Sequence, residues 1–404
     1  MIDSKYIRKH FPSLNRFDDN DNKIIYLDGP AGTQVPQIVI DGISDYYKNS
    51  NANTHGEFIT SQETDIIMDS MRKKAAELLG AENKNCISIG QNMTSLCFSL
   101  AKALSKKFKA GDEVIITELD HEANRGPWKT LKEIGVKLIE INLLDNGTLD
   151  YEDFENKITD KTVLVAMGMS SNAIGTLNDF KRVKNFIKNK KCYFLLDAVH
   201  YAPHFSIDVK EFGCDFLLCS AYKFYGPHIG ILYSKPSLLD KLDTDNLIVQ
   251  NQKSPYKIET GTLNHASCNG VSKAIDFISN LGEGNNYREK IIDAYNKLGV
   301  HEHNIASYLY EEINKIENLV VIGPDFSTKR RTPTVSFIHK HMTANEVCKI
   351  LGKNNICAWD GHFYAIKAIQ KLNLEKIGGV TRLGISAYNT IDEIDKTVKV
   401  LSKI

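Results

Sequence analysis

The stretch CYFLLDAVHYAPH, residues 192–204, decides the fold, together with DFLLCSAYKFYGP at residues 215–227. In each stretch a short apolar run ends in polar groups, Asp197 and His200 in the first and Lys223 in the second. Runs of four to six apolar residues predict strands that are buried on both faces. In open α/β sheets, ligands bind outside the carboxyl ends of such strands. We therefore expect Asp197 and Lys223 to lie at one ligand-binding edge.

Similar apolar runs recur between about residues 38 and 266, separated by segments long enough for helices. The runs lie at 86–89, 113–117, 137–141, 163–167, 193–197, 216–220 and 229–233, and the clearest helical patterns at 94–104, 125–134 and 179–189. This alternation is typical of βαβ units. It predicts an α/β fold with a largely parallel sheet.

The length of 404 residues exceeds the ~250–300 residues over which a single hydrophobic core keeps growing. We expect an N-terminal segment (1–37), a large α/β domain (38–284) and a small C-terminal α+β domain (285–404). Residues 234–258 lose periodicity, which indicates a long surface segment. In the small domain we expect strands at 319–322, 334–338, 356–359 and 381–385, and helices at 287–316, 344–351 and 392–402.

The amino-acid composition indicates which class of molecule the protein binds. Lys plus Arg and Asp plus Glu number 50 each, which favours a small molecule over nucleic acid or an anionic membrane. The N-terminus lacks the apolar stretch of a signal peptide, and no run approaches the ~18–20 apolar residues of a membrane span. The eight cysteines are scattered, without a C-x-x-C pair or a His at zinc-ligand spacing. We expect reduced thiols, no metal site and a cytoplasmic location.

A lysine and a carboxylate at one strand edge are the two protein groups that pyridoxal 5′-phosphate requires. The amine forms a Schiff base with the aldehyde, and the carboxylate keeps the pyridine nitrogen protonated so that the ring accepts electrons. Alone, Asp197 is as well explained by a helix cap and Lys223 by a surface charge. Their spacing and the Ser-x-x-Lys-x-x-Gly-Pro context favour the cofactor. Neither nucleotide-phosphate motif, G-x-G-x-x-G or G-x-x-x-x-G-K-[ST], occurs.

Further motifs give the chain a family resemblance. They are TELDHEANRGPW (117–128), MSSNAIGT (169–176), IETGT (258–262) and TRLGISAYNT (381–390). With the Asp197 and Lys223 segments, the chain resembles class V aminotransferases, a group that includes cysteine desulfurases, selenocysteine lyases and kynureninases. The resemblance implies a fold-type-I transferase with a seven-stranded, mainly parallel sheet in the large domain. It also implies a homodimer, because Thr262 resembles a residue that reaches the cofactor phosphate of the neighbouring subunit.

The resemblance also implies roles around the cofactor. His121 resembles the imidazole that stacks on the cofactor ring and serves in proton transfer. His200 stands where desulfurases place a glutamine on the ring oxygen, and Tyr222 where many relatives have a histidine. Ser220 and the helix-opening Thr94 and Ser95 resemble phosphate-binding groups, although a helix cap alone explains the last two.

For the substrate, Arg382 and Asn172 match the pair that holds an amino acid's α-carboxylate. A guanidinium fork suits a carboxylate because it binds both oxygens. Ala31 and Gly32, in YLDGPAGTQVP, resemble a mobile loop near the substrate. His55, in NANTHGEF, is a weaker candidate.

The pattern departs from the desulfurases at WDGHFYA, residues 359–365. Group II desulfurases carry R-x-G-H-H-C-A there, so Tyr364 takes the place of the nucleophilic cysteine and Trp359 that of the arginine. A phenol cannot accept sulfane sulfur, because persulfide transfer needs a thiolate. Cys357, on a predicted strand, is better explained as a core thiol than as a substitute nucleophile.

The chain therefore resembles a desulfurase-like subfamily without the thiol. We predict a C–S lyase in which Lys223 deprotonates Cα and a thiol leaves by β-elimination from a cysteine-derived amino acid. His362 and Tyr364 are candidates for protonating the leaving group. The alternatives are a desulfurase that uses another thiol, an aminotransferase or epimerase, and a cofactor-binding regulator without turnover.

Overall fold

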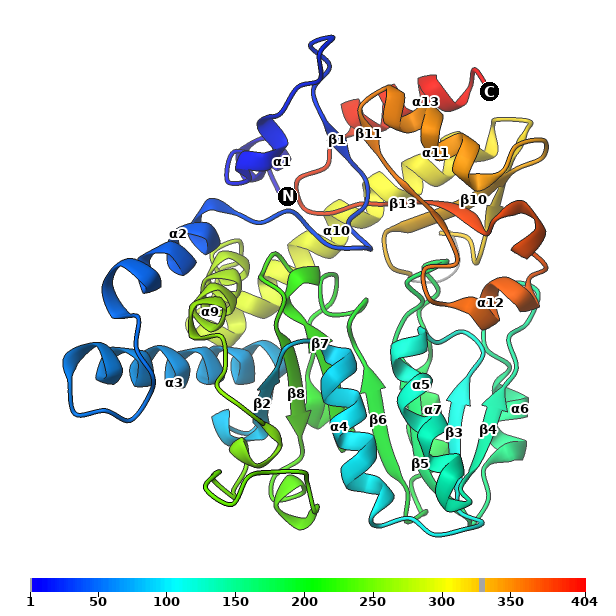
Figure 1. The fold of residues 1–404 in the computed structure, drawn as a ribbon. Coiled ribbons are helices and arrows are strands. Elements are labelled where there is room, and N and C mark those ends of the chain that lie inside the picture. Colours follow the sequence, from blue (N-terminus) through cyan, green and yellow to red (C-terminus); the bar gives the residue numbers. More distant parts are fainter. Residues whose placement is uncertain (1, 327–330) are drawn as a thin grey trace.

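The computed structural model describes residues 2–326 and 331–404 (Figure 1). Within these ranges the main sheet has seven strands in the order β2-β8-β7-β6-β5-β3-β4. They are β2 (Ile87–Gly90), β3 (Glu113–Thr117), β4 (Lys137–Ile141), β5 (Thr162–Gly168), β6 (Tyr193–Asp197), β7 (Phe216–Ser220) and β8 (Gly230–Ser234). Every strand that the sequence predicted for this sheet is present, with ends that differ by one residue at most.

The sheet is mainly parallel. β4, β3, β5, β6 and β7 pair in parallel, whereas β8 is antiparallel to both of its neighbours, β7 and β2. The central strands read as unbroken apolar runs because layers cover both faces. The carboxyl ends of β5, β6 and β7 therefore open on the same edge, as expected for Asp197 and Lys223.

Successive strand residues enter two different cores. Leu195 packs in the core that contains α4 (Met93–Ser105), whereas Phe194 and Leu196 pack in the core that contains α3 (Ile59–Leu79) and α9 (His265–Ser279). The same alternation occurs on β3 and β7. This period of two places the sheet between two helical layers.

Two helices are shorter or less regular than predicted. The segment 125–134 forms α5 (Gly126–Lys129), continues as a 3-10 turn (Thr130–Ile134) and ends at Gly135 in the left-handed region. The segment 179–189 forms α7 (Phe180–Phe186), which Asp179 caps. At Ile187 the backbone leaves helical geometry, with ψ near 4°, so the last three predicted residues lie outside the helix.

The C-terminal part contains a second, antiparallel sheet in the order β12-β13-β10-β9. Its strands are β9 (Leu319–Ile322), β10 (Thr334–His339), β12 (Trp359–Gly361) and β13 (Val380–Gly384), and it packs with α11 (Ala344–Lys353) and α13 (Ile391–Leu401). α10 (Tyr287–Asn314) joins the two regions, because Leu298 packs in the large core and Leu309 in the small one. The remaining α-helices are α1 (Ser4–Arg8), α2 (Gln37–Asp45), α6 (Tyr151–Lys157), α8 (Val209–Phe212) and α12 (Ile366–Lys371).

The prediction of one strand at 356–359 is wrong. The chain breaks at Ala358 into β11 (Ile356–Cys357) and β12, and the two parts pair in different sheets. β11 pairs in parallel with β1 (Ile25–Tyr26) near the N-terminus, whereas β12 pairs with β13. An apolar run in the sequence does not indicate that the neighbouring strand changes part-way along it.

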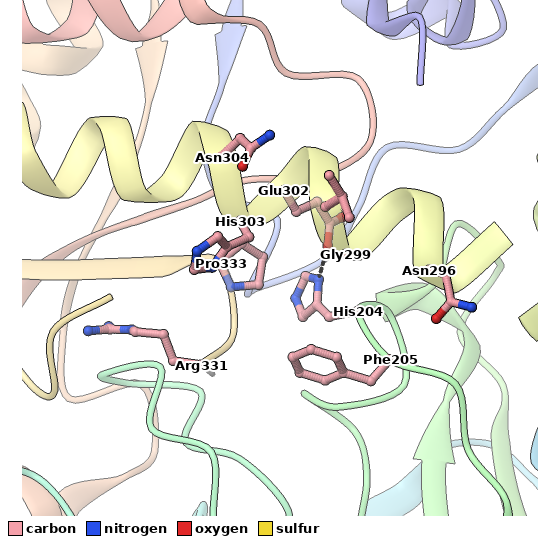
Figure 2. A pocket seen from close by; sticks show the side chains of 10 residues that line it. His204, Phe205, Asn296, Gly299, Glu302, His303, Asn304, Arg331 and Pro333 are labelled. Atoms are coloured by element: carbon pink, nitrogen blue, oxygen red, sulfur yellow. Dashed lines mark hydrogen bonds and ion pairs between the residues drawn. The ribbon is translucent and has the colours of Figure 1, made fainter. Parts of the chain in front are cut away.

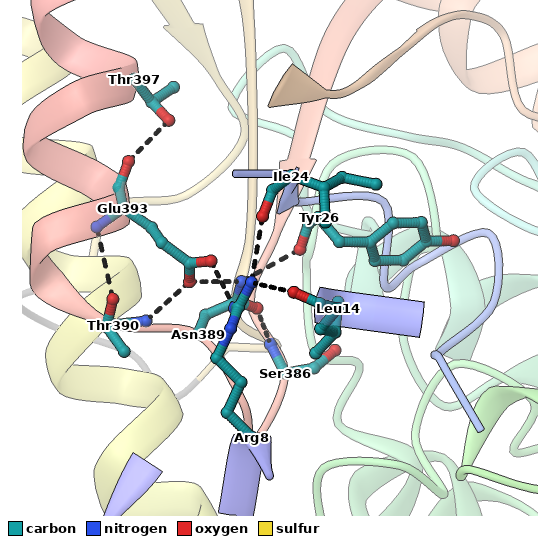
Figure 3. A network of polar contacts seen from close by, with 9 residues as sticks. All are labelled: Arg8, Leu14, Ile24, Tyr26, Ser386, Asn389, Thr390, Glu393 and Thr397. Atoms are coloured by element: carbon teal, nitrogen blue, oxygen red, sulfur yellow. Dashed lines mark hydrogen bonds and ion pairs between the residues drawn. The ribbon is translucent and has the colours of Figure 1, made fainter. Parts of the chain in front are cut away.

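An ion pair and hydrogen bonds connect the N-terminal segment to the C-terminal helix. Figure 3 shows Arg8 reaching Glu393 on α13, with Nη1 2.5 Å from Oε1, while Nη2 donates to the carbonyl oxygens of Leu14 and Ile24. Asn389 donates to Glu393 and to the carbonyl oxygen of Tyr26. These contacts fix the chain just before residues 28–32, which reach the candidate site. We keep the division into 1–37, 38–284 and 285–404 as a proposal.

The described residues contain neither a membrane-spanning helix nor a metal-binding cluster. None of their helices has the length and apolar character needed to cross a membrane. No cluster of three or more His, Cys, Asp or Glu side chains there is suited to hold a metal ion.

Candidate active site

A cavity at the carboxyl ends of β5, β6 and β7 collects half of the predicted site residues. Those that line it are Thr94, His121, Asn172, Asp197, His200, Ser220, Tyr222 and Lys223, together with Asn92, Met93, Ala123, Gly168, Ser170 and Val199. They come from five separate stretches of the chain. The parallel strands bring these stretches together because their carboxyl ends share one edge.

Lys223 ends a 3-10 turn directly after β7 and is buried. Its Nζ donates to the carbonyl oxygen of Pro30, in the N-terminal loop. Burial, and after it the charge of Arg382, lower the pKa of Lys223 to about 7, although the charges of Asp28 and Asp197 oppose the shift. A substantial fraction of the amine is therefore neutral, and nucleophilic, near neutral pH.

Asp197 is the last residue of β6, and its carboxylate accepts a hydrogen bond from the Val199 amide at 2.9 Å. Burial raises its pKa to about 6, although Lys223 counteracts part of this shift. One carboxylate has about four acceptor positions. Asp197 therefore retains capacity for a ligand that donates a proton.

Two histidines line the cavity in neutral form. Burial lowers the pKa of His121 to about 4, with further contributions from Lys223 and Arg382, and its Nδ1 accepts from the Ala123 amide at 3.0 Å. Burial also lowers the pKa of His200 well below its usual value. His200 Nε2 lies 3.1 Å from Thr334 Oγ1, whereas its Nδ1 is buried without a hydrogen-bond partner.

The N-terminus of α4 faces the same cavity. Asn92 caps this helix by accepting from the Ser95 amide at 2.8 Å, and the Met93 amide donates to Ser220 Oγ at 3.1 Å. A glycine is required at 230, because a Cβ there would lie 2.3 Å from the carbonyl carbon of Asn92. Free amides and hydroxyls at a helix N-terminus are suited to bind a phosphate.

Ser95 does not line this cavity. It lies instead in a neighbouring surface groove that also contains Thr262. Thr262 shares a further groove with His55, whose Nδ1 is 3.0 Å from an oxygen of Asp65. Ser95, Thr262 and His55 are therefore not brought into the central cavity of this chain.

Arg382, on β13, is not among the residues that line the cavity, because other groups enclose its guanidinium. Nη2 lies 3.1 Å from Asp28 Oδ1, and Nη1 donates to the carbonyl oxygen of Asn172 at 2.9 Å. The ring of Phe363 covers the guanidinium at 3.8 Å. Asp28 lies in YLDGPAGTQVP and Phe363 in WDGHFYA, but nothing in either segment indicates a contact with Arg382.

The loop at 361–364 borders the site from outside. Phe363 and Tyr364 both have positive φ, at 50° and 60°, a conformation that non-glycine residues adopt rarely. Tyr364 is 64% exposed, but its ring centroid is 5.3 Å from that of His121. Its carbonyl oxygen accepts from the Glu122 amide, and its own amide donates to His362 Nδ1. Backbone strain of this kind concentrates at functional sites.

The N-terminal loop that contains Ala31 and Gly32 covers Lys223. Besides the contact of Pro30 with Lys223, the Gly32 carbonyl accepts from the Tyr26 hydroxyl at 2.9 Å, and the Thr33 amide donates to the Tyr222 carbonyl. Ala31 and Gly32 do not line the cavity itself.

Comparison with known proteins decides the family. The sequence profile described as Aminotransferase class-V matches residues 25–397. This chain belongs to the class-V aminotransferase family. A probable cysteine desulfurase of Halalkalibacterium halodurans is 31% identical over 98% of this chain and 97% of its own. A probable cysteine desulfurase of Borreliella burgdorferi is also 31% identical, over 99% of this chain and 96% of its own.

A solved cysteine desulfurase structure has the same fold as this chain. The apo structure of a cysteine desulfurase from Thermococcus onnurineus NA1 matches with a TM-score of 0.88 at 26% identity, covering 100% of this chain and 98% of the other. The class-V chain therefore has the fold-type-I architecture and is an enzyme. This outcome removes the support for a regulator without turnover.

The cavity of this class-V enzyme fits pyridoxal phosphate, the cofactor of the family. It offers a partly neutral amine, a buried carboxylate with free acceptor positions and a neutral imidazole, His121. Within residues 2–326 and 331–404, His200 Nδ1 has no hydrogen-bond partner, and the helix N-terminus with Ser220 and Thr94 offers donors for a phosphate. Each chemical part of the cofactor thus has a complementary group.

Asp120 is a group that sequence reasoning missed. It is buried next to His121 and accepts from the Gly168 amide at 2.6 Å and the Thr117 amide at 3.1 Å. Burial raises its pKa to about 7. The sequence places Asp120 directly before His121 in LDHEAN, which could have indicated a role in the site. An acid in that position is equally expected to stabilise a turn through hydrogen bonds to backbone amides.

A second cavity, of about 350 Å³, lies beside α10 (Figure 2). It is lined by His204 and by Glu302 of α10, whose Oε2 is 2.9 Å from His204 Nδ1. The ring centroids of His200 and His204 are 5.5 Å apart. The two imidazoles therefore stand between the candidate active site and this cavity.

Proposed function

We propose that this class-V enzyme is a pyridoxal-phosphate-dependent C–S lyase. Its substrate would be a cysteine-derived amino acid, which β-elimination converts with water into pyruvate, ammonia and a thiol. The observation that carries the proposal is the state of the cysteines. All eight lie within the described residues, none lines the cavity, and burial raises the pKa of every one.

The two cysteines nearest in sequence to the 361–364 loop illustrate the point. Burial raises the pKa of Cys348 to about 12 and that of Cys357 above its usual value. Persulfide transfer requires a thiolate that attacks the substrate sulfur. A thiol that stays protonated at neutral pH cannot fill that role, which supports elimination over sulfur transfer.

Bound pyridoxal phosphate would supply an electron sink for the negative charge that develops at Cα. Lys223 Nζ would take the Cα proton, because its lowered pKa leaves part of the amine unprotonated near neutral pH. Asp197 would keep the pyridine nitrogen protonated, because its buried carboxylate would stabilise the positive charge there. The neutral ring of His121 would pack on the face of the bound ring.

The remaining groups would orient the substrate and serve its leaving group. Arg382 and Asn172 would bind the α-carboxylate, and the 361–364 loop would cover the side chain of the substrate. The Tyr364 hydroxyl, with His362 beside it, would donate a proton to the departing sulfur. The contact between the Tyr364 and His121 rings supports this placement.

We also propose a homodimer. Thr262 and His55 are exposed in a shared groove on the surface of this chain and not in its central cavity. A contribution of Thr262 to the phosphate site of a second copy would explain that position.

A second candidate function is a desulfurase whose acceptor thiol comes from another molecule. It is favoured by the names of the relatives, which are cysteine desulfurases. Product analysis separates the two. Pyruvate and a thiol from an S-substituted cysteine support the lyase. Alanine from cysteine, with the sulfur transferred to an added acceptor thiol as a persulfide, supports the desulfurase.

A further inference from the structure

Arg382 has no free edge for a carboxylate in this structure. A carboxylate that binds bidentately needs two adjacent N–H groups of the guanidinium. Asp28 occupies Nη2, and the Asn172 carbonyl occupies Nη1. Nε is buried and has no hydrogen-bond partner among the described residues, so the edge that joins Nε and Nη2 is occupied only where Asp28 contacts Nη2.

Asp28 is itself held in place through its backbone. It forms a bridge with Gly384, and the Gly384 amide donates to the Leu27 carbonyl at 2.7 Å. The amides of Ala31 and Gly32 both donate to the Asp28 carbonyl. These contacts tie the backbone of Asp28 to β13, so a displacement from Arg382 would have to come from rotation of the side chain.

We propose that Asp28 is an internal competitor for the substrate carboxylate on Arg382, so that carboxylate binding displaces the Asp28 side chain and takes up one proton. The charge balance is simple. Before binding, Asp28 carries the negative charge beside Arg382, and after binding the substrate carboxylate carries it while Asp28 holds a proton from solvent. The proposal rests on the proposed role of Arg382 in substrate binding.

The surroundings of Asp28 favour protonation once the ion pair is broken. Burial raises the pKa of Asp28, and the proximity and hydrogen bond of Arg382 are the main effects that oppose the rise, followed by the charge of Lys223. When a substrate carboxylate screens Arg382, those opposing effects weaken while burial remains.

The other titratable groups that face Asp28 do not supply a countercharge. They are Tyr26 of β1, whose pKa burial raises to about 12, and the thiols Cys357 of β11 and Cys348 of α11. All three are neutral near pH 7. A displaced Asp28 carboxylate would therefore lack a cationic partner other than Lys223.

The test uses the holoenzyme and propionate, which has the carboxylate but no amine or leaving group. Calorimetric titration in two buffers of different ionisation enthalpy gives the number of protons taken up. We expect close to one proton per propionate at pH 8, and a dissociation constant that rises about tenfold per pH unit in that range. Propionamide, which has no charge, serves as the control ligand and should bind without proton uptake.

The Asp28→Asn variant keeps the size of the side chain but removes the charge. We expect it to bind propionate at least about tenfold more tightly at pH 8, because no carboxylate at position 28 competes for Arg382. Binding should take up no proton, because asparagine does not titrate. Asp360→Asn is the matched control, because Asp360 contacts Asn345 and not Arg382. Arg382→Lys should abolish the tight binding in the Asp28→Asn background.

Proton uptake near zero in the unsubstituted enzyme would overturn the proposal without reference to any variant. Unchanged or weaker propionate binding by Asp28→Asn would also overturn it and make Asp28 a partner that orients Arg382. Because propionate is not turned over, neither result depends on whether the enzyme is a lyase. A failure of the proposed function would appear in product analysis instead.

Discussion

At the residue scale, Tyr364 is the side chain on which the proposed preference for elimination over sulfur transfer depends most. Its exposed ring lies over His121, on a loop whose backbone has positive φ at two residues. We predict that Tyr364→Cys forms alanine from L-cysteine and retains the sulfur as a persulfide on the introduced thiol, because an exposed thiol at this place would be free to ionise and attack. Added dithiothreitol, a two-electron reductant, should then release that sulfur as sulfide.

The control is Tyr364→Ser, which also removes the ring but supplies no thiolate. Alanine measured by chromatography should appear only with the cysteine variant. If the serine variant, or the unsubstituted enzyme, forms alanine equally well, position 364 does not control the choice between the two reactions.

The buried amine of Lys223 should make the stability of the cofactor-free protein depend on pH. Its pKa is lowered to about 7 from 10.5, so the unfolded chain binds more protons than the folded chain between these values, and stability rises with pH there. Lys223→Met should therefore stabilise the protein by up to about 5 kcal/mol at pH 7, less whatever attraction to Asp197 and Asp28 is lost. The gain should shrink toward pH 10.

Urea unfolding at a series of pH values measures this difference. Lys223→Arg is the control, because arginine keeps its charge throughout the range and should give no gain. A methionine variant whose advantage is the same at pH 7 and pH 10 would show that packing, and not the buried charge, causes it.

The site residues that directly follow a strand could be predicted from the sequence. The contacts between residues far apart in the sequence could not. Lys223 and Asp197 were predictable because an apolar run directly precedes each of them. The contact between Arg382 and Asp28 joins residues 354 positions apart, and no local pattern encodes it. The same holds for the ring of Phe363 over Arg382.

At the scale of elements, the N-terminus of α4 depends on a close approach between β8 and the segment before the helix. Gly230→Ala would place a Cβ 2.3 Å from a backbone atom of Asn92, so the helix N-terminus must shift away from Ser220. We predict a strain of ~1–3 kcal/mol and a loss of cofactor affinity of about tenfold or more. Equilibrium titration with pyridoxal phosphate measures the loss.

Gly352→Ala provides the comparison, because a Cβ at this position in α11 meets no atom within 4 Å. It should leave cofactor affinity unchanged and stabilise the helix by roughly 0.5–1 kcal/mol. Equal cofactor affinity in the two variants would mean that the α4 N-terminus does not hold the phosphate.

Elements were predictable to the extent that their own side chains determine them. The strands of the main sheet are buried on both faces, so each is a continuous apolar run with ends close to those expected. The short helices α5 and α7 were less predictable, because caps and tertiary contacts decide where such helices end. The split between β11 and β12 reflects two pairing partners, which one apolar run cannot reveal.

At the scale of the whole molecule, an exposed apolar segment is the strongest sign of a second copy. Leu247, Ile248 and Val249 are 57%, 101% and 91% exposed, and Leu247 and Val249 line the groove that holds Thr262 and His55. Exposed apolar groups of this kind mark interaction surfaces. We predict that the enzyme is a dimer and that Ile248→Asp dissociates it and weakens cofactor binding.

Sedimentation equilibrium at micromolar concentration checks the assembly. Val300→Asp is the matched control, since Val300 is 56% exposed on α10 beside the second cavity and should not affect the dimer. A monomeric unsubstituted enzyme, or an Ile248→Asp variant that stays dimeric, would contradict the placement of the interface.

The central claim is that Lys223 drives elimination at a cysteine-derived amino acid without a protein thiol. The most direct measurement incubates the holoenzyme with S-substituted cysteines and with L-cysteine, and quantifies pyruvate, alanine, thiol and sulfide in the same samples. We expect pyruvate and thiol in equal amounts from an S-substituted cysteine, and neither product with Lys223→Ala. Alanine as the main product from L-cysteine, with its sulfur released as sulfide only when dithiothreitol is added, would contradict the proposed elimination.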